Sequence, residues 1–369
     1  MNLTLAEKIA NAVLYEGYIL YPYRPSAVKN RQRWTFGGIY PPAYAAAQGG
    51  TDASSIQTQC LVRGGSDAKL NVRVRFLHLQ ERIVGELEQP LPAAETPLPS
   101  LRSGQALAKE GQGEVDLKIR PVQALRIGEK VFGSWQESVE REISATDLSL
   151  NELMAEPQQR DFAFGSGREL EHVCDASNQV IGVIIRQQQA IAGTIEMAAA
   201  QLEDQLFKIT VRIVNHTPFE DTQRNGRDAA LLCSFVSTHS ILSVRDGEFV
   251  SLLDPPEEYG EAAAGCRNIG TYPVLVGEQG ERDLMLSSPI ILYDYPQIAP
   301  ESAGDLFDGT EIDEILTLRI LTLTDEEKQE ARQVDERARE LLDRIEALSR
   351  EQLLKLHGVM HGRERQKEK

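Results

Sequence analysis

Two stretches of this sequence alternate between apolar and polar side chains, and this pattern limits the fold more than any other feature. Residues 70–79 read LNVRVRFLHL, and residues 206–215 read LFKITVRIVN. Successive side chains of a β-strand point to opposite faces, so such alternation is typical of a strand with one buried face. In the first stretch the pattern places His78 on the same face as Phe76. The sequence therefore predicts a body built on β-sheet.

Further strand-like runs follow one another closely. Residues 56–62 and 70–79 flank the turn-like sequence RGGSD, which predicts a β-hairpin. Strands are also predicted at residues 115–119, 180–186, 192–201 and 206–214. Their connections are too short for helical crossovers, so antiparallel pairing is expected. RDGE at residues 245–248 predicts another turn, whereas residues 229–242 fit a buried helix or a strand equally well.

Both ends of the sequence carry helical patterns. Leu5, Ile9 and Val13 recur at helical spacing within residues 3–16, which predicts an amphipathic helix ended by Gly17. Near the other end, Thr324 opens the sequence TDEE, a capping box that precedes a charged helical stretch. The expected fold class is α+β, a mostly antiparallel, sandwich-like β body with N-terminal and C-terminal helices.

The same patterns divide the sequence into four segments. Residues 1–88 hold the N-terminal helix, a basic aromatic loop and the β-hairpin. Residues 89–113, rich in proline and without periodicity, are expected to form a flexible linker or loop. Residues 114–323 form the β-rich body, and residues 324–369 form a charged helix and tail.

Charge and composition exclude several classes of function. The formal net charge of −17 disfavours nonspecific binding to nucleic acid or to an anionic membrane, which both need a positive field. No apolar run of about 18 residues and no signal-peptide pattern occurs, so a cytoplasmic protein is expected. The four cysteines lack CxxC spacing and are interpreted as reduced residues, mostly in the core. Cys266, next to Arg267, leaves open a thiol of lowered pKa.

Motifs for catalysis and metal binding are missing from the sequence. It contains no GxSxG, no P-loop, no dinucleotide fingerprint and no HExxH. His216, Glu220, Asp221 and His239 can be drawn as a ligand set, but their spacing does not require it. We therefore assign no catalytic residue, no metal and no cofactor.

Residues 21–41, YPYRPSAVKNRQRWTFGGIYP, form a basic, aromatic segment in an acidic chain. No Asp or Glu occurs between Glu16 and Asp52. Arg and Trp anchor protein interfaces, and aromatic residues beside cations also bind single-stranded nucleic acid. The segment is interpreted as a partner-protein anchor or as a loop folded over the acidic body of the same chain; the net charge disfavours nucleic acid. Its candidate contact residues are Arg24, Lys29, Arg31, Arg33 and Trp34.

Residues 293–316 are acid-rich and begin with Tyr-Asp-Tyr-Pro. Asp308 and Gly309 predict a turn, and Thr310 with the acids after it suits a helix N-terminus. The alternative interpretation is a binding surface that includes Tyr293 and Tyr295. The basic and acidic segments would then contact each other or present one joint surface.

Two blocks together resemble a known group of proteins. They read YILYPYRPSAVKNRQRWTFGGIYP and SSPIILYDYPQIAPESAGDLFDGTEIDEILTLRILTLTDEEK. In about 70 residues the chain resembles uncharacterised accessory proteins encoded with uptake nickel–iron (NiFe) hydrogenases of the high-affinity, oxygen-tolerant group. The resemblance implies a cytoplasmic, non-enzymatic factor for hydrogenase assembly or maturation that acts by protein–protein binding, with a hydrogenase subunit as the candidate partner.

Two alternatives stay open at this point. One is a hydrolase or transferase whose site lies between the β body and the acidic loop at residues 293–316, near His216 or His239. The other is a structural subunit of a larger complex. The oligomeric state is left open.

Overall fold

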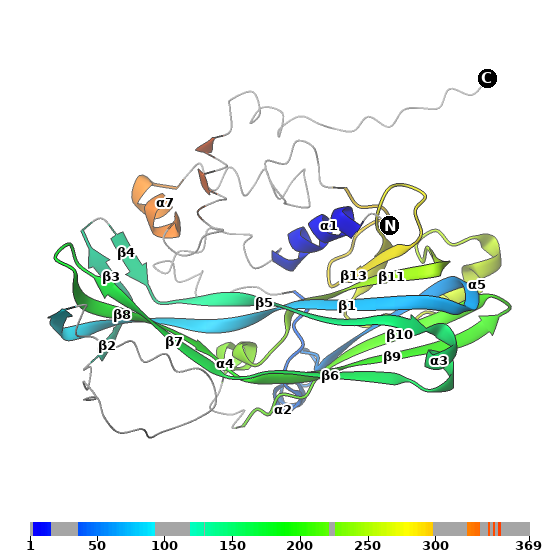
Figure 1. The fold of residues 1–369 in the computed structure, drawn as a ribbon, viewed down its shortest axis with the longest axis horizontal. Helices are drawn as coiled ribbons and strands as arrows, with labels where there is room; N and C mark the ends of the chain where they lie inside the picture. The colour runs from blue at the N-terminus through cyan, green and yellow to red at the C-terminus, as the bar shows by residue number, and fades with distance from the viewer. Residues whose placement is uncertain are drawn as a thin grey trace.

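The computed structural model describes residues 3–15, 36–92, 119–128, 130–220, 226–297 and 323–332, with a few single positions between 339 and 347. The protein is mostly antiparallel β-sheet with few short helices (Figure 1). Strands account for 56% of it and helices for 18%, so strand pairing dominates the architecture.

One very long strand, β1 (Ser55–Pro92), organises the sheet and runs along most of its length (Figure 1). Some residues of β1 pair with two strands, one on each edge of β1. These residues show which partner strands lie on the same edge. Along one edge β1 pairs in turn with β10 (Leu206–Asn215), β5 (Trp135–Ser149) and β2 (Ile119–Val122). Along the other edge it pairs with β11 (Val236–Val250) and then β8 (Gln179–Gln188). All five pairings are antiparallel.

The remaining strands extend this framework on both sides. The sheet order is β12-β13-β11-β1-β10-β9-β6, with β7 paired to β8. The added strands are β12 (Tyr272–Leu275), β13 (Leu284–Ser288), β9 (Ile191–Glu203), β6 (Gln158–Phe164) and β7 (Gly167–Cys174). A separate two-stranded hairpin consists of β3 (Ala124–Ile127) and β4 (Lys130–Gly133).

Short helices lie at the connections. They are α2 (Pro42–Ala47), α3 (Leu150–Ala155), α4 (Arg227–Leu232), the 3₁₀ helix η3 (Glu257–Tyr259) and α5 (Gly260–Ala264). Helix α7 (Asp325–Arg332) begins directly after Thr324, as the capping box predicts.

The main hydrophobic core forms where alternate residues of β1 meet β5, β6, β9, β10 and β11. Its aromatic centre is built on Phe76, whose ring stacks on Phe235 with centroids 4.7 Å apart. Phe162 of β6 packs 5.3 Å from Phe235. Gly193 permits this packing, because a Cβ there would lie 2.6 Å from the Val214 carbonyl oxygen and 2.7 Å from both rings.

Helix α1 (Leu3–Tyr15) confirms the helix predicted near the N-terminus and packs on β11, β12 and β13. Ala6, Ile9, Ala10 and Val13 are fully buried there. They pack on a cluster from the three strands and the segment after them: Ile241, Val274, Val276, Leu284, Leu286 and Leu292. The helix is therefore part of the fold and not a loosely attached arm.

The predicted hairpin at residues 56–79 is wrong, because both runs belong to the single strand β1. RGGSD does not reverse the chain. It lies opposite RDGE of β11, the second predicted turn, where the register jumps between Gly64 and Lys69. A Cβ on Gly64 would lie 2.9 Å from the Asp246 carbonyl oxygen, and Asp246 has a φ of 59°. The glycines and aspartate serve a bulge inside a continuous ladder.

Other strand predictions agree with the structure. Residues 180–186, 192–201 and 206–214 are strands β8, β9 and β10. Residues 229–242 combine both open interpretations, since α4 ends at Leu232 and β11 begins at Val236. Strand β1 continues past residue 88 to Pro92, and residues 93–118, most of the predicted linker, lie outside the described residues.

Candidate functional site

The predicted contact residues divide into two groups. Arg24, Lys29, Arg31, Arg33 and Trp34 all lie outside the described residues, as does the acidic stretch from residue 298 to 316. Tyr293 and Tyr295 are described, on the segment that follows β13. This segment is where the structure informs the predicted surface.

Residues 290–293 alternate in burial although they form no strand. Ile290 and Leu292 pack into the cluster beneath α1. Ile291 is 73% exposed and Tyr293 is 85% exposed. The inward side chains thus fix the segment to the body, while the outward ones are presented to solvent.

Asp294 fastens the end of this segment to the sheet. Its Oδ1 accepts a hydrogen bond of 2.8 Å from the Leu275 amide, and its Oδ2 accepts one from the Ser251 hydroxyl. The Tyr295 amide donates to the Leu275 carbonyl at 2.7 Å, and the Tyr295 ring packs partly against the main core. Tyr293 therefore projects from a fixed backbone. Sequence reasoning grouped Asp294 with the acidic surface and missed this structural role.

Most exposed large apolar side chains of the described residues lie around β12. At one end of β12, Tyr272 is the cross-strand partner of Ser288. At its other end, the backbone of Leu275 is hydrogen-bonded to Asp294 and Tyr295. Residues 289–293 therefore run alongside β12 from one end to the other. Ser251, bonded to Asp294, brings Leu253 to the same place. Of six such exposed side chains, five belong to β12 or to the segments before and after it in the chain, and we refer to them as the β12 patch: Leu253, Ile269, Tyr272, Ile291 and Tyr293.

The backbone edge of β12 offers little to a further strand. Leu275 uses its N–H and its C=O on Asp294 and Tyr295. Two residues earlier on the same edge stands Pro273, which has no N–H. Edge protection of this kind disfavours strand addition, so any partner at the β12 patch would contact side chains.

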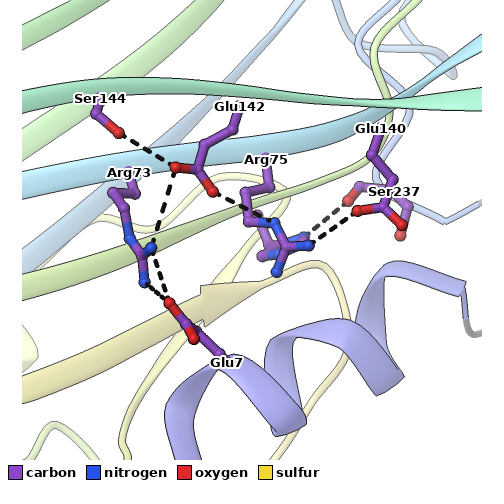
Figure 2. A network of polar contacts seen from close by, with 8 residues as sticks. Glu7, Arg73, Arg75, Glu140, Glu142, Ser144 and Ser237 are labelled. Carbon is purple, nitrogen blue, oxygen red and sulfur yellow. Dashed lines mark hydrogen bonds and ion pairs between the residues drawn. The ribbon is translucent and has the colours of Figure 1, made fainter. Parts of the chain in front are cut away.

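A network of ion pairs lies on the α1 side of the sheet (Figure 2). Glu7 of α1 accepts two hydrogen bonds of 3.0 Å from the guanidinium of Arg73 on β1. On β5, Glu142 lies between Arg73 and Arg75, at 4.0 and 3.7 Å, and Glu140 pairs with Arg75 at 3.2 Å. These groups are half-buried or partly exposed, so the network orients α1 more than it stabilises the fold.

His239 lies on the same face of the sheet as its cross-strand partner Arg75 and is fully buried. Its Nδ1 pairs with the Ser237 carbonyl at 3.1 Å, and its Nε2 has no hydrogen-bond partner. Burial lowers the pKa of His239 to about 4, and the charge of Arg75 acts in the same direction. The imidazole is therefore neutral at pH 7.

His78 lies on the opposite, inner face of β1 with Phe76, as the alternation predicts, and is fully buried. Neither of its ring nitrogens has a hydrogen bond of full geometry, although the Gln189 backbone lies close enough to act on the ring. Burial lowers the pKa of His78 to about 4; the nearby guanidinium of Arg141 adds to this effect and the Gln189 carbonyl opposes it.

The ligand set drawn from the sequence is not supported as a cluster. His216 is exposed whereas His239 is fully buried, and Asp221 lies outside the described residues. In the described part of the chain, no group of three or more His, Cys, Asp or Glu side chains is arranged to hold a metal ion.

Three of the cysteines, Cys60, Cys233 and Cys266, have thiols whose pKa is raised by burial, the opposite of an activated thiol. For Cys266 the alternative of a lowered pKa is wrong, because the side chain is half-buried against α5 and Lys208 offsets the burial only in part.

Among the described helices none is long and apolar enough to cross a membrane.

No protein-family model matches the chain, and no curated protein is significantly similar to it. A functional argument for this chain therefore rests on the exposed residues of the β12 patch and not on similarity to known proteins.

Proposed function

We propose that this chain is a non-enzymatic accessory protein that binds a partner protein through the β12 patch. One observation carries the proposal: Tyr293 and Ile291 are 85% and 73% exposed on a backbone that Asp294 and Leu275 hold in place. Large apolar side chains gathered on a rigid support are typical of interfaces, because their burial releases water while little conformational entropy is lost.

The charges beside the patch indicate the chemistry of the partner. Directly after Leu253 come four exposed acids, Asp254, Glu257, Glu258 and Glu261. Opposite potentials across an interface speed association and exclude wrong partners. The favoured partner surface is therefore apolar with basic residues around it. The same chemistry is carried by residues 21–35 of this chain, which would compete for the patch or extend it.

The resemblance to hydrogenase accessory proteins suggests which class of protein the partner belongs to. We propose a subunit of a NiFe-hydrogenase during assembly or maturation, in the cytoplasm. The second of the two resembling blocks begins at Ser287 and contains Ile291, Tyr293 and Asp294, so it includes the exposed part of the β12 patch.

A binding experiment with purified hydrogenase subunits tests both statements. Wild-type protein is compared with Ile291→Ser/Tyr293→Ser and with Leu202→Ser. Leu202 is 41% exposed on β9, which four other strands separate from β12 in the sheet order, and it serves as a matched control. We expect the double variant to weaken binding at least about tenfold, as interface anchors do, and the control to bind like wild type.

The outcomes separate the two parts of the proposal. If wild type binds a subunit and the double variant binds it equally well, the β12 patch is not the surface. If wild type binds neither subunit, the hydrogenase assignment is wrong. An Arg31→Ala/Arg33→Ala/Trp34→Ala variant, tested in parallel, shows whether the basic segment belongs to the same interface.

A permanent structural subunit would use the same patch, and stoichiometry distinguishes the two roles. Native mass spectrometry of untagged protein from its host is expected to show mostly free chain for an accessory factor. A stable complex in which no free chain is found would favour the structural subunit.

We also propose that the β body is sandwich-like within an α+β fold. Supporting this, the two end strands of the sheet order, β6 and β12, contribute Phe162 and Leu275 to one common core. Facing layers of one curved sheet account for that shared cluster.

A further inference from the structure

Arg141 of β5 is a partly buried cation without a carboxylate partner among the described residues. Its Nη2 donates to Gln188 Oε1 at 2.9 Å, and its guanidinium carbon lies 4.5 Å from the centroid of the Phe164 ring. Two other arginines further along this face do form ion pairs with carboxylates. Arg82 and Arg186 share Glu137, at 3.1 and 2.8 Å. Arg186 also pairs with Glu171, so of these three arginines Arg141 is the one without an ion pair among the described residues.

His78 is the neighbour of Arg141 on this face. Arg141 is the cross-strand partner of Phe76, and His78 follows two residues later, which makes it the diagonal neighbour. Both ring nitrogens of His78 and the Nε of Arg141 are buried without a hydrogen-bond partner. In a neutral imidazole one nitrogen donates and the other accepts, so the unpaired donors here are one N–H of His78 and the Nε–H of Arg141. Both donors suit a ligand that accepts hydrogen bonds.

The backbone at His78 differs from the rest of β1. On one edge of β1 the pairing with β11 ends at Leu77 and the pairing with β8 begins at Gln80. His78 and Leu79 thus lie where two partner strands separate from each other. Gln188 is the last residue of β8 and pairs with Gln80 of β1. Its side chain accepts a hydrogen bond from Arg141 and donates one of 2.9 Å to the Gly165 carbonyl, which fixes the guanidinium in place.

We propose that Arg141 and His78 bind a small oxyanion, a carboxylate or a phosphate, at this break between β11 and β8. A neutral imidazole donates one N–H, and the planar guanidinium donates through Nε and its remaining N–H groups. Oxyanions match this geometry because their oxygens accept several hydrogen bonds and neutralise the arginine. A cation is disfavoured, because the guanidinium of Arg141 is itself positive and the Glu137 carboxylate is already paired with Arg82 and Arg186.

Thermal unfolding and calorimetric titration of the whole protein test this site. The probes are sodium phosphate and sodium acetate, each at constant ionic strength. We expect one of them to raise the melting temperature saturably in wild type, and which one does so identifies the anion class. Arg141→Gln is expected to abolish the effect, and His78→Asn to weaken binding about tenfold. Arg168→Gln, an exposed arginine on β7, is the control and is expected to behave like wild type.

A second variant protects the test against misfolding. Arg141→Lys keeps the charge but loses the planar fork, so it is expected to fold and to bind more weakly than wild type. The imidazole ¹⁵N resonances of His78 provide a local readout and are expected to shift with the effective anion. The proposal fails if neither anion stabilises wild type beyond the ionic-strength control, or if Arg141→Gln responds like wild type. Water alone would then be the hydrogen-bond partner of these nitrogens. None of these outcomes depends on partner binding at the β12 patch.

Discussion

At the scale of single residues, the two fully buried histidines set how the protein responds to acid. His78 and His239 both have a pKa near 4, against 6.5 for an ordinary histidine. Between these values the unfolded chain binds protons that the folded chain does not. The stability contributed by neutral burial is therefore complete above about pH 6.5 and is lost as the pH falls toward 4.

This behaviour gives a prediction for the pH dependence of unfolding. A shift of about 2.5 units corresponds to roughly 3 kcal/mol for each histidine at the acid end. We expect His78→Phe and His239→Phe each to flatten the fall of unfolding free energy between pH 6.5 and 4, measured by urea denaturation. His216→Gln, at an exposed position, is expected to leave the slope unchanged. A slope that stays the same in both phenylalanine variants would contradict the assignment.

At the scale of elements, α1 shows which interaction holds a helix to this sheet. Ile9 is fully buried between α1 and the strands, whereas Glu7 and Arg73 form a partly exposed ion pair. The Ser237 hydroxyl adds a hydrogen bond of 3.2 Å to the Val13 carbonyl near the other end of the helix. Burial of apolar surface should outweigh the ion pair, because solvent screens exposed charges.

The comparison can be measured with two substitutions in one helix. Ile9→Ala is expected to cost about 2–5 kcal/mol of unfolding free energy. Glu7→Gln is expected to cost less than about 1 kcal/mol. Urea denaturation at pH 7 gives both values. Equal costs would show that the network of Figure 2 contributes far more than its exposure indicates.

Also at this scale, the paired bulge of β1 and β11 shows where local signals mislead. RGGSD and RDGE each contain the residues that turns prefer. They lie opposite each other in the ladder, where glycine relieves a close backbone contact. The local requirement for small or φ-positive residues is the same in a turn and in a bulge, so sequence could identify the residues but not the structure.

At the scale of the whole molecule, β1 links nearly every part of the sheet. Residues 69–77 have a partner strand on each side along most of their length, while β6 pairs only with β9 among the described strands. Opening the centre of β1 would break two ladders and expose the main core. Its amides should therefore exchange only through global unfolding.

Hydrogen exchange tests this hierarchy. We expect peptides covering residues 70–77 to exchange most slowly and peptides covering residues 158–164 to exchange much faster at pH 7 and 25 °C. Residues 78 and 79, at the break between β11 and β8, are expected to be intermediate. Uniform exchange across all three would mean that the sheet opens as a single unit.

The sequence by itself determined the alternating strands, the amphipathic helix near the N-terminus, the helix start after Thr324 and the burial of His78. Each of these follows from side-chain periodicity or from a local capping pattern. Only the tertiary structure decided that the two runs of residues 56–79 form one strand, and that Asp294 supports the loop presenting Tyr293. It alone brought Arg141 beside His78. These facts depend on partners from 19 residues away, for Asp294 and Leu275, to 189 residues away, for Leu61 and Val250. Local periodicity carries no information about which distant strand a residue will meet.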